Sequence, residues 1–109
     1  MDSFQHISVA EVDKLLTDKA AIKVVDIRDP QSYALGHPSG ALLLNNDSLP
    51  IFIEQADQAA PTLVFCYHGN SSKGAAEYLA SQGFKEVYSL NGGFSQWSAM
   101  FPEQCETGN

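Results

Sequence analysis

The sequence predicts an α/β fold in which a parallel β-sheet is covered by helices on both faces. Runs of apolar and β-branched residues alternate along the chain with segments of helical periodicity, which is typical of right-handed crossovers between parallel strands. The apolar runs contain few polar residues, as expected of strands buried on both faces. The length of 109 residues and the ordinary apolar content predict a single domain, 1–109, with a core at about 4–102 and a polar C-terminal tail at 103–109.

The first expected element is a helix near the N-terminus. Ser8 and Glu11 stand at the spacing of a capping box, in which each residue satisfies a free backbone N–H of the other. Ile7 and Val12 are placed to pack across the start of the helix as a hydrophobic staple. The apolar stripe of this helix comprises Val12, Leu15 and Leu16.

Two strands and a short helix are expected next. The segment 21–27 is rich in β-branched residues and predicts a buried strand. Asp29 is a good N-cap and Pro30 fits the first helical turn, so a helix is expected from there to Gly36. The short apolar segment 41–44 predicts another strand.

The second half continues the alternation of helices and strands. A helix is expected over 47–58, a strand from 61 to Cys66, a helix that ends at Gly83, and a last strand over 87–90. A turn at 91–93 then leads to a helix in which Phe94 and Trp97 pack at helical spacing. The face of the 47–58 helix comprises Leu49, Phe52, Ile53 and Ala56, and that of the helix ending at Gly83 comprises Ala75, Ala76, Leu79 and Ala80.

The composition excludes several classes of partner. Thirteen acidic and six basic residues give a net charge of −7, which opposes binding to nucleic acid or to an anionic membrane. The start of the chain does not read as a secretory signal, and no apolar run suggests a membrane span, so we expect a cytoplasmic protein. We expect a monomer or a weak homodimer. Cys105, in the polar tail, is expected to be a bystander that does not pair with Cys66.

Cys66 ends the third expected strand and is followed by a polar loop that leads into a helix. The first N–H groups of a helix lack partners and carry partial positive charge, so they stabilise an anion. Gly69 permits a positive φ and Asn70 tolerates the left-handed region, so that successive N–H groups can turn inward. Ser71 and Ser72 add hydroxyl groups at the helix cap. The pattern predicts a reactive cysteine, with inert packing as the alternative.

The chemistry expected of this cysteine depends on its pKa. A free thiol with a pKa of about 8.5 is only a few per cent thiolate at neutral pH. Lowering that pKa by one unit takes about 1.4 kcal/mol of preferential stabilisation of the anion. Several amide hydrogen bonds and a helix terminus, each worth about 1 kcal/mol or more, would therefore make thiolate the main form without a catalytic base.

Three side chains near Cys66 are each open to two interpretations. His68 is either a partner of the thiol or an exposed loop residue. Tyr67 either walls the pocket or covers neighbouring apolar surface. Lys73, in the first turn of the helix, is either a solvated charge or attracts an anionic substrate. A positive charge there opposes the helix dipole, which gives the second interpretation some support.

Charged and imidazole groups elsewhere are expected to be structural. Asp26 and Arg28 lie at the end of the first expected strand, 21–27, on the same sheet edge as Cys66, and we expect an ion pair that involves Arg28, with Asp29 as a candidate partner. His37, in a rigid turn, is expected to bind backbone groups. The spacing of the histidines does not match a metal site, so neither a metal nor a cofactor is expected. The histidines are His6, His37 and His68.

Three motifs occur in order along the chain: VDIR at 25–28 with GHP at 36–38, CYHGNS at 66–71, and NGGF at 91–94 with Trp97. In these motifs and over about 4–102 the chain resembles a single-domain rhodanese (thiosulfate sulfurtransferase), most closely of the GlpE type. The resemblance implies a three-layer α/β/α rhodanese-like fold with a small parallel sheet of about five strands and helices on both faces.

The resemblance also implies thiosulfate sulfurtransferase activity. The thiolate of Cys66 would attack the outer sulfur of thiosulfate, sulfite would leave, and a Cys66 persulfide would remain. A thiophilic acceptor, cyanide in the family's assay or a dithiol protein such as thioredoxin in the cell, would then take the sulfur in a ping-pong reaction. Lys73 would attract the anionic donor. The loop expected to bind substrate and persulfide comprises Tyr67, His68, Gly69, Asn70, Ser71 and Ser72.

Two other functions stay open on the sequence alone. A cysteine phosphatase or arsenate reductase on the related fold also uses a thiolate in a ring of amides, but that pattern requires an arginine where this chain has Ser72. The only arginine in the chain is Arg28. The other alternative is a noncatalytic rhodanese-like domain for protein contact, against which the retention of Cys66 in a glycine-bearing loop argues.

Overall fold

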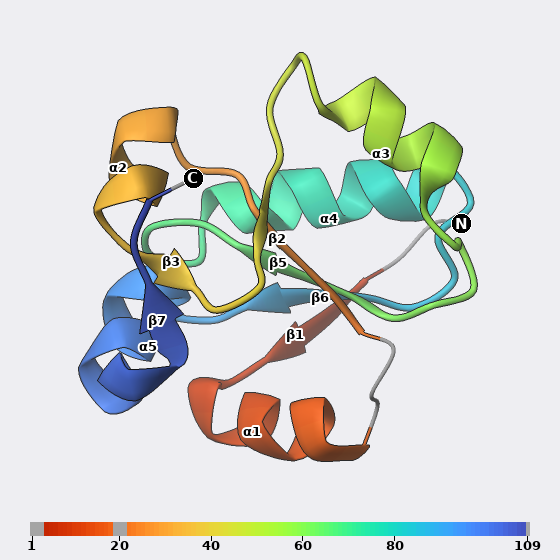
Figure 1. Ribbon diagram of the computed structural model, residues 1–109. Helices are drawn as coiled ribbons and strands as arrows, with labels where there is room; N and C mark the ends of the chain where they lie inside the picture. The colour runs from red at the N-terminus through yellow and green to blue at the C-terminus, as the bar shows by residue number, and fades with distance from the viewer. Residues whose placement is uncertain (1–3, 19–21, 109) are drawn as a thin grey trace.

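A five-stranded parallel sheet forms the centre of the molecule (Figure 1). The computed structural model describes residues 4–18 and 22–108, without the side chains of 16–18. The expected place of Leu16 in the apolar stripe, and the start of the first expected strand at residue 21, therefore lie outside the described residues. The spatial order is β1-β6-β5-β2-β4, and each neighbouring pair is parallel. The strands are β1 (Gln5–Ile7), β2 (Lys23–Asp26), β4 (Leu42–Leu43), β5 (Thr62–Phe65) and β6 (Val87–Leu90).

Helices cover both faces of this sheet, as predicted (Figure 1). Successive residues of β5 face opposite sides of the sheet. Phe65 packs in the cluster that contains Trp97, and Val64 packs in the cluster that contains Phe52 and Leu79. Among the described residues, no helix has the length and apolar character needed to span a membrane. On one face lie α1 (Val9–Asp18) and α5 (Gly93–Met100), on the other α3 (Leu49–Gln55) and α4 (Ser71–Ser81), and α2 (Pro30–Leu35) follows β2.

Side chains fix the starts of the first two helices in the way the sequence predicts. The Ser8 N–H donates to Glu11 Oε1 at 3.0 Å, and the Glu11 N–H donates to Ser8 Oγ at 3.3 Å. This reciprocal pair is the predicted capping box. At α2 the Ser32 N–H donates to the Asp29 carboxylate at 3.0 Å, with Pro30 in the first turn. Both caps confirm the expected helix starts.

The helix expected over 47–58 is shorter in the structure. Proline at position 50 stands in the first turn of α3, and the segment before it is held by Asn45, whose side-chain oxygen accepts the N–H groups of Asp47 and Ser48 at 2.9 Å each. Ala56 leaves the helix in an extended conformation. The predicted apolar face is confirmed, because its members pack in one core cluster with α4. They are Leu49, Phe52, Ile53 and Ala56.

The segment from Pro102 to Glu106 forms regular secondary structure, although the polarity of the tail does not predict order. It forms a 3₁₀ helix, η1 (Pro102–Gln104), and the strand β7 (Cys105–Glu106), which pairs antiparallel with β3 (His37–Pro38). His37 Nδ1 contacts the Tyr33 carbonyl oxygen at 2.7 Å, and its Nε2 lies 3.3 Å from Glu106 Oε1. His37 therefore binds backbone, as expected, and also ties the end of the chain to α2.

We expect substitution of the central strand to destabilise the fold. Leu63→Ala removes a side chain with no exposed surface from the middle of β5, and the cavity should lower the free energy of unfolding by about 2–5 kcal/mol. Leu42→Ala, at an edge-strand residue that is 48% exposed, should cost about 1 kcal/mol or less. Urea denaturation measures both variants, and equal losses would contradict the assigned core.

Candidate active site

Cys66 lies at the carboxyl end of the central strand, where the chain turns into α4. Its Sγ accepts a hydrogen bond from the Gly69 N–H at 3.1 Å and lies 3.3 Å from Ser72 Oγ. Only 2% of the residue is exposed. The sulfur is therefore enclosed by its own loop and by the first turn of α4, and the amides of that loop are aimed at it.

Two opposing effects act on the acidity of this thiol. Burial raises the pKa of Cys66, while hydrogen bonds from the Ser72 side chain and from the backbone N–H groups of Ser72, Gly69 and His68 lower it. The hydrogen bonds prevail, so the pKa of Cys66 lies below its ordinary value. A lower pKa increases the share of thiolate, which is the nucleophilic form of cysteine.

The start of α5 holds the loop from outside. The Phe94 N–H donates to the Cys66 carbonyl oxygen at 2.7 Å, and the Ser95 N–H donates to the Tyr67 carbonyl oxygen at 3.0 Å. This contact needs glycine at position 93, whose φ is +61°. A Cβ there would lie 2.5 Å from the Tyr67 oxygen and 2.6 Å from the Cys66 oxygen.

Gly69 also fills a position that a side chain would obstruct. Its φ is +93°, a conformation that glycine adopts without strain. A Cβ at this position would lie 2.8 Å from the Gly92 nitrogen and 2.9 Å from the Leu90 oxygen. The Cys66 loop is thus pressed against the end of β6, and the Gly69 N–H reaches the sulfur from there.

A buried serine that sequence reasoning missed lies behind Ser72. Ser89, on β6, places its Oγ 2.7 Å from Ser72 Oγ, and both residues are fully buried. In the sequence Ser89 is one polar residue inside an apolar strand, which is the one signal that could have drawn attention to it. Its proximity to Ser72 depends on the packing of α4 on β6, which local patterns do not reveal.

Arg28 is structural, as expected, but its partner is Asp26. Its Nη2 donates to Asp26 Oδ2 at 2.7 Å, its Nε donates to Asp26 Oδ1 at 3.0 Å, and Nη2 also donates to the Gly36 carbonyl oxygen at 2.5 Å. The guanidinium lies 4.1 Å from the centre of the Phe94 ring. Asp29, the candidate partner, instead caps α2 and accepts a hydrogen bond from the Tyr67 hydroxyl.

Tyr67 links the Cys66 loop to α2. Its hydroxyl donates to Asp29 Oδ1 and lies 2.7 Å from Ser32 Oγ. The Tyr67 bond, together with bonds from Ser32, lowers the pKa of Asp29 to about 2. The Tyr67 ring is partly exposed and lies 5.6 Å from the Arg28 guanidinium. The structure thus anchors the hydroxyl group of Tyr67 to the first turn of α2.

The other predicted loop residues lie at the outer side of the site. His68, Asn70, Ser71 and Lys73 are exposed, and the Lys73 N–H donates to the Asn70 carbonyl oxygen at 3.3 Å in the first turn of α4. The structure gives no hydrogen bond between the His68 ring and the Cys66 sulfur among the described contacts, so His68 is a loop residue beside the thiol. The described residues contain no cluster of three or more metal-ligating side chains.

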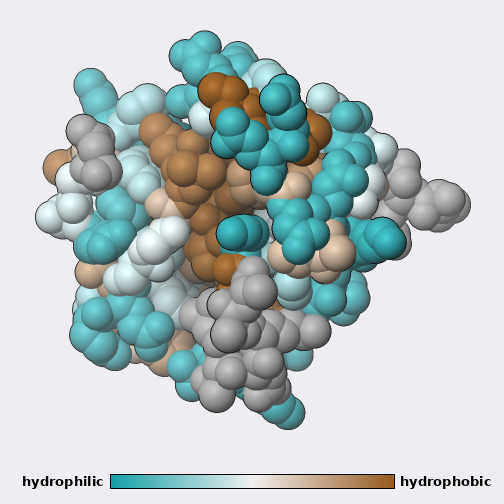
Figure 2. All heavy atoms as spheres, turned by 45° about the vertical axis from the view of Figure 1, so that its right-hand side comes forward, coloured by the Kyte–Doolittle hydropathy of each residue, from teal (hydrophilic) through white to brown (hydrophobic). Residues whose placement is uncertain are grey.

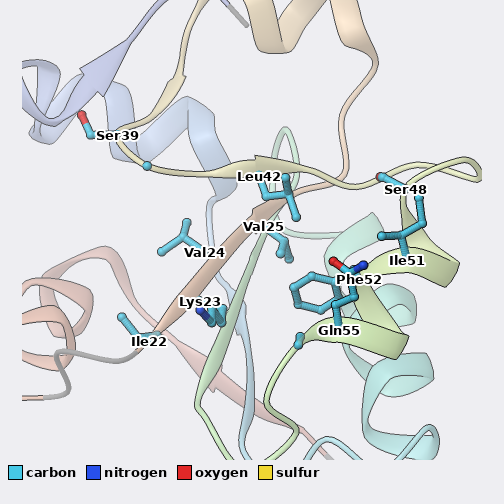
Figure 3. Close-up of a pocket in the computed structure, with 12 residues that line it drawn as sticks. Ile22, Lys23, Val24, Val25, Ser39, Leu42, Ser48, Ile51, Phe52 and Gln55 are labelled. Atoms are coloured by element: carbon cyan, nitrogen blue, oxygen red, sulfur yellow. The ribbon is translucent and has the colours of Figure 1, made fainter.

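A separate hollow lies away from Cys66, with a volume of about 730 Å³. It is bounded by β2, by the β4 segment and by α3, and Figure 3 shows Val25, Leu42 and Phe52 directed towards it. Figure 2 shows a band of hydrophobic side chains, flanked by hydrophilic ones, on one face of the molecule. The residues that line the hollow do not include Cys66 or its loop. This hollow and the candidate active site are therefore separate regions of the molecule.

Substitution of Gly93 should disturb the loop from outside. We expect Gly93→Ala to lower the free energy of unfolding by about 2 kcal/mol or more, because the new Cβ meets two backbone oxygens and the positive φ disfavours it. Gly74→Ala is the control, since Gly74 is exposed within α4 with open space around its Cβ position; it should stabilise by about 0.5–1 kcal/mol. Thermal unfolding distinguishes the two, and a stable Gly93→Ala would contradict the contact.

Removal of the Tyr67 hydroxyl should raise the pKa of Asp29 from about 2 towards its ordinary value of 3.8. Because the folded pKa is the lower one, the carboxylate stabilises the fold above pH 3.8, and this effect is lost as the pH falls through about 2. NMR titration of the Asp29 carboxyl group in Tyr67→Phe measures the change. Tyr78→Phe, at an exposed tyrosine of α4, should leave the Asp29 titration where it is, and a shift there would implicate an indirect effect.

Comparison with known proteins places these features in a family. The rhodanese-like domain model matches residues 8–100. The chain is 55% identical over 109 residues to the thiosulfate sulfurtransferase GlpE of Ectopseudomonas mendocina, a match that covers 100% of this chain and 98% of that protein.

Solved structures show the same fold at lower identity. The NMR structure of the rhodanese-like domain of Alr3790 from Anabaena sp. matches with a TM-score of 0.83 at 22% identity, covering 96% of this chain and 80% of that chain. A rhodanese-like domain protein from Staphylococcus aureus matches with a TM-score of 0.75 at 23% identity, covering 86% of this chain and 91% of that one. The family match, the near-complete alignment with a curated relative and the shared fold agree: this chain belongs to the rhodanese-like domain family.

Proposed function

We propose that this chain is a thiosulfate sulfurtransferase in which Cys66 carries the transferred sulfur as a persulfide. The observation that carries the proposal is the surroundings of the Cys66 sulfur, which accepts the Gly69 N–H at 3.1 Å and lies 3.3 Å from Ser72 Oγ. These donors favour the thiolate, and the lowered pKa of Cys66 agrees with that. The 55% identical relative named for this activity supports the assignment.

The reaction follows from the nucleophilicity of this sulfur. The Cys66 thiolate attacks the outer sulfur of thiosulfate, a new S–S bond forms, and the S–S bond of the donor breaks with its electron pair leaving on sulfite. In the second half, a thiophilic acceptor attacks the outer sulfur of the persulfide, and the electron pair of that S–S bond returns to Cys66. With cyanide the product is thiocyanate, and both half-reactions balance without a cofactor.

We assign the loop residues their roles from position. The backbone N–H groups of the loop hold the negative charge that resides on Cys66 before transfer and on the outer sulfur afterwards. Lys73, exposed at the first turn of α4, adds a positive charge near the entrance for an anionic donor. The loop residues are Tyr67, His68, Gly69, Asn70, Ser71 and Ser72.

The geometry disfavours the phosphatase and arsenate reductase alternatives. Those reactions need an arginine free to bind the oxyanion. The position that requires it holds Ser72, which is fully buried, and the one arginine of the chain, Arg28, is bound by Asp26 and the Gly36 carbonyl oxygen. A noncatalytic role is disfavoured because such a role would not require hydrogen-bond donors gathered around Cys66.

We propose that residues 1–109 act as one domain, as a monomer or a weak homodimer, with thiosulfate as donor and cyanide or a dithiol protein such as thioredoxin as acceptor. A cytoplasmic location fits the chemistry, because a reducing compartment keeps Cys66 free of disulfides.

The proposal predicts that thiosulfate adds one sulfur atom to the protein and that cyanide removes it. Intact mass spectrometry before and after each reagent measures this. Cys66→Ser should lose the added sulfur and reduce thiosulfate:cyanide activity by about 1000-fold or more, because the nucleophile is gone. Cys105→Ser is the matched control and should retain both. Full sulfur transfer by Cys66→Ser, or addition of sulfur to Cys105 alone, would refute the assignment.

A further inference from the structure

A chain of two buried hydroxyl groups leads from Cys66 to the neighbouring strand. Ser72 Oγ lies 3.3 Å from Cys66 Sγ and 2.7 Å from Ser89 Oγ. Ser72 and Ser89 are both 0% exposed, so water does not compete for these contacts. We propose that Ser89 is a positioning residue that directs the hydroxyl group of Ser72 at the Cys66 sulfur. The inference rests on the proposed role of Cys66 as the nucleophile.

The direction of the hydrogen bonds follows from the number of protons. A thiolate can only accept, so Ser72 must donate its single hydroxyl proton to Cys66. The lone pairs of the Ser72 oxygen then need a hydrogen-bond donor in a buried place. The hydroxyl group of Ser89, 2.7 Å away, donates that hydrogen bond. When the thiol is protonated, the order can reverse, with Cys66 donating to Ser72 and Ser72 to Ser89.

Without Ser89 the Ser72 hydroxyl would lose this constraint. Serine side chains near a helix start also form hydrogen bonds with nearby backbone groups. Without the hydroxyl group of Ser89, the Ser72 hydroxyl group would therefore populate several orientations. Ser89 is held in β6, which pairs with β1 on one side and with β5 on the other. A rigid strand thus fixes the donor that Cys66 meets.

The same orientation assists both half-reactions. Cys66 is the attacking thiolate in the first and the leaving thiolate in the second, when the acceptor takes the outer sulfur. A donor already aimed at Cys66 stabilises the charge that develops on it without reorganisation during the reaction.

Charged side chains do not provide an alternative source of this stabilisation. On the elements around the thiol, Asp26 and Arg28 bind each other, and His68 and Lys73 are exposed. The pKa of Cys66 responds to burial and then to hydrogen bonds, with none of these four side chains among the causes. The hydroxyl of Ser72 is the side-chain donor on which the thiolate depends.

The test is the pH dependence of alkylation of Cys66 by iodoacetamide, read by mass spectrometry of the peptide so that Cys105 is scored separately. In Ser89→Ala the midpoint of the alkylation profile should move up by about half a pH unit to one unit, the effect of a lost or misdirected hydrogen bond. Ser89→Thr keeps a hydroxyl group and should return the midpoint towards that of the parent protein.

Two further comparisons separate positioning from a general loss of stability. Thr62→Val removes another buried hydroxyl group, on the adjacent strand β5, and this hydroxyl group has no hydrogen-bond partner among the described residues; the substitution should leave the midpoint unchanged. In a Ser72→Ala background, Ser89→Ala should add no further shift, because Ser89 acts through Ser72.

If Ser89→Ala does not fold, Ser89→Cys fills the same space with a weak donor and should also raise the midpoint.

An unchanged midpoint in folded Ser89→Ala or Ser89→Cys would overturn the inference, as would an equal shift in Thr62→Val or a shift from Ser89→Ala that persists without Ser72. Alkylation requires no thiosulfate. A protein with the expected midpoints that takes no sulfur from thiosulfate would therefore contradict the proposed function and leave the positioning role of Ser89 supported.

Discussion

The site depends on the direction of the peptide groups that follow Cys66. The Ser95 N–H at the start of α5 binds the Tyr67 carbonyl oxygen at 3.0 Å. The peptide bond is planar and trans, so the N–H at the other side of the same peptide, that of His68, points the opposite way. This N–H is one of the donors that lower the pKa of Cys66. The start of α5 thus holds the carbonyl groups of the Cys66 loop outward. The N–H groups of the same loop, at the start of α4, therefore face the sulfur anion.

Charge has a different task in this molecule. The chain carries a net charge of −7. Its single arginine is held by other partners and is not available to the thiol. Arg28 is bound by Asp26 and by the Gly36 carbonyl oxygen, and it stacks on Phe94 of α5. The guanidinium therefore joins the ends of β2, α2 and α5 around the loop. Stabilisation of the sulfur anion is left to backbone and hydroxyl dipoles, which remain effective where water is excluded.

The sequence was sufficient for local features and insufficient for contacts between distant segments. Apolar periodicity, the capping box of Ser8 and the strand-loop-helix pattern at Cys66 are local, and they predicted the sheet, the starts of α1 and α2, and the thiol with its ring of amides. The choice of Asp26 over Asp29 by Arg28, and the meeting of Ser72 with Ser89, depend on how the elements pack. The short strand β1 and the pairing of β7 with β3 were missed for the same reason, because partners far along the chain order segments that are short or polar.

Burial of Cys66 has two effects that must be weighed together. Removing the sulfur from water disfavours the thiolate, and burial is the largest single influence on its pKa. The same exclusion of water makes each hydrogen bond to the sulfur stronger, because no solvent competes for the donor. Fully buried donors such as Ser72 therefore contribute more than an exposed charge at the rim such as Lys73. A net lowering of the Cys66 pKa despite burial requires several donors at once, which explains why the site engages the loop, the first turn of α4 and β6 together.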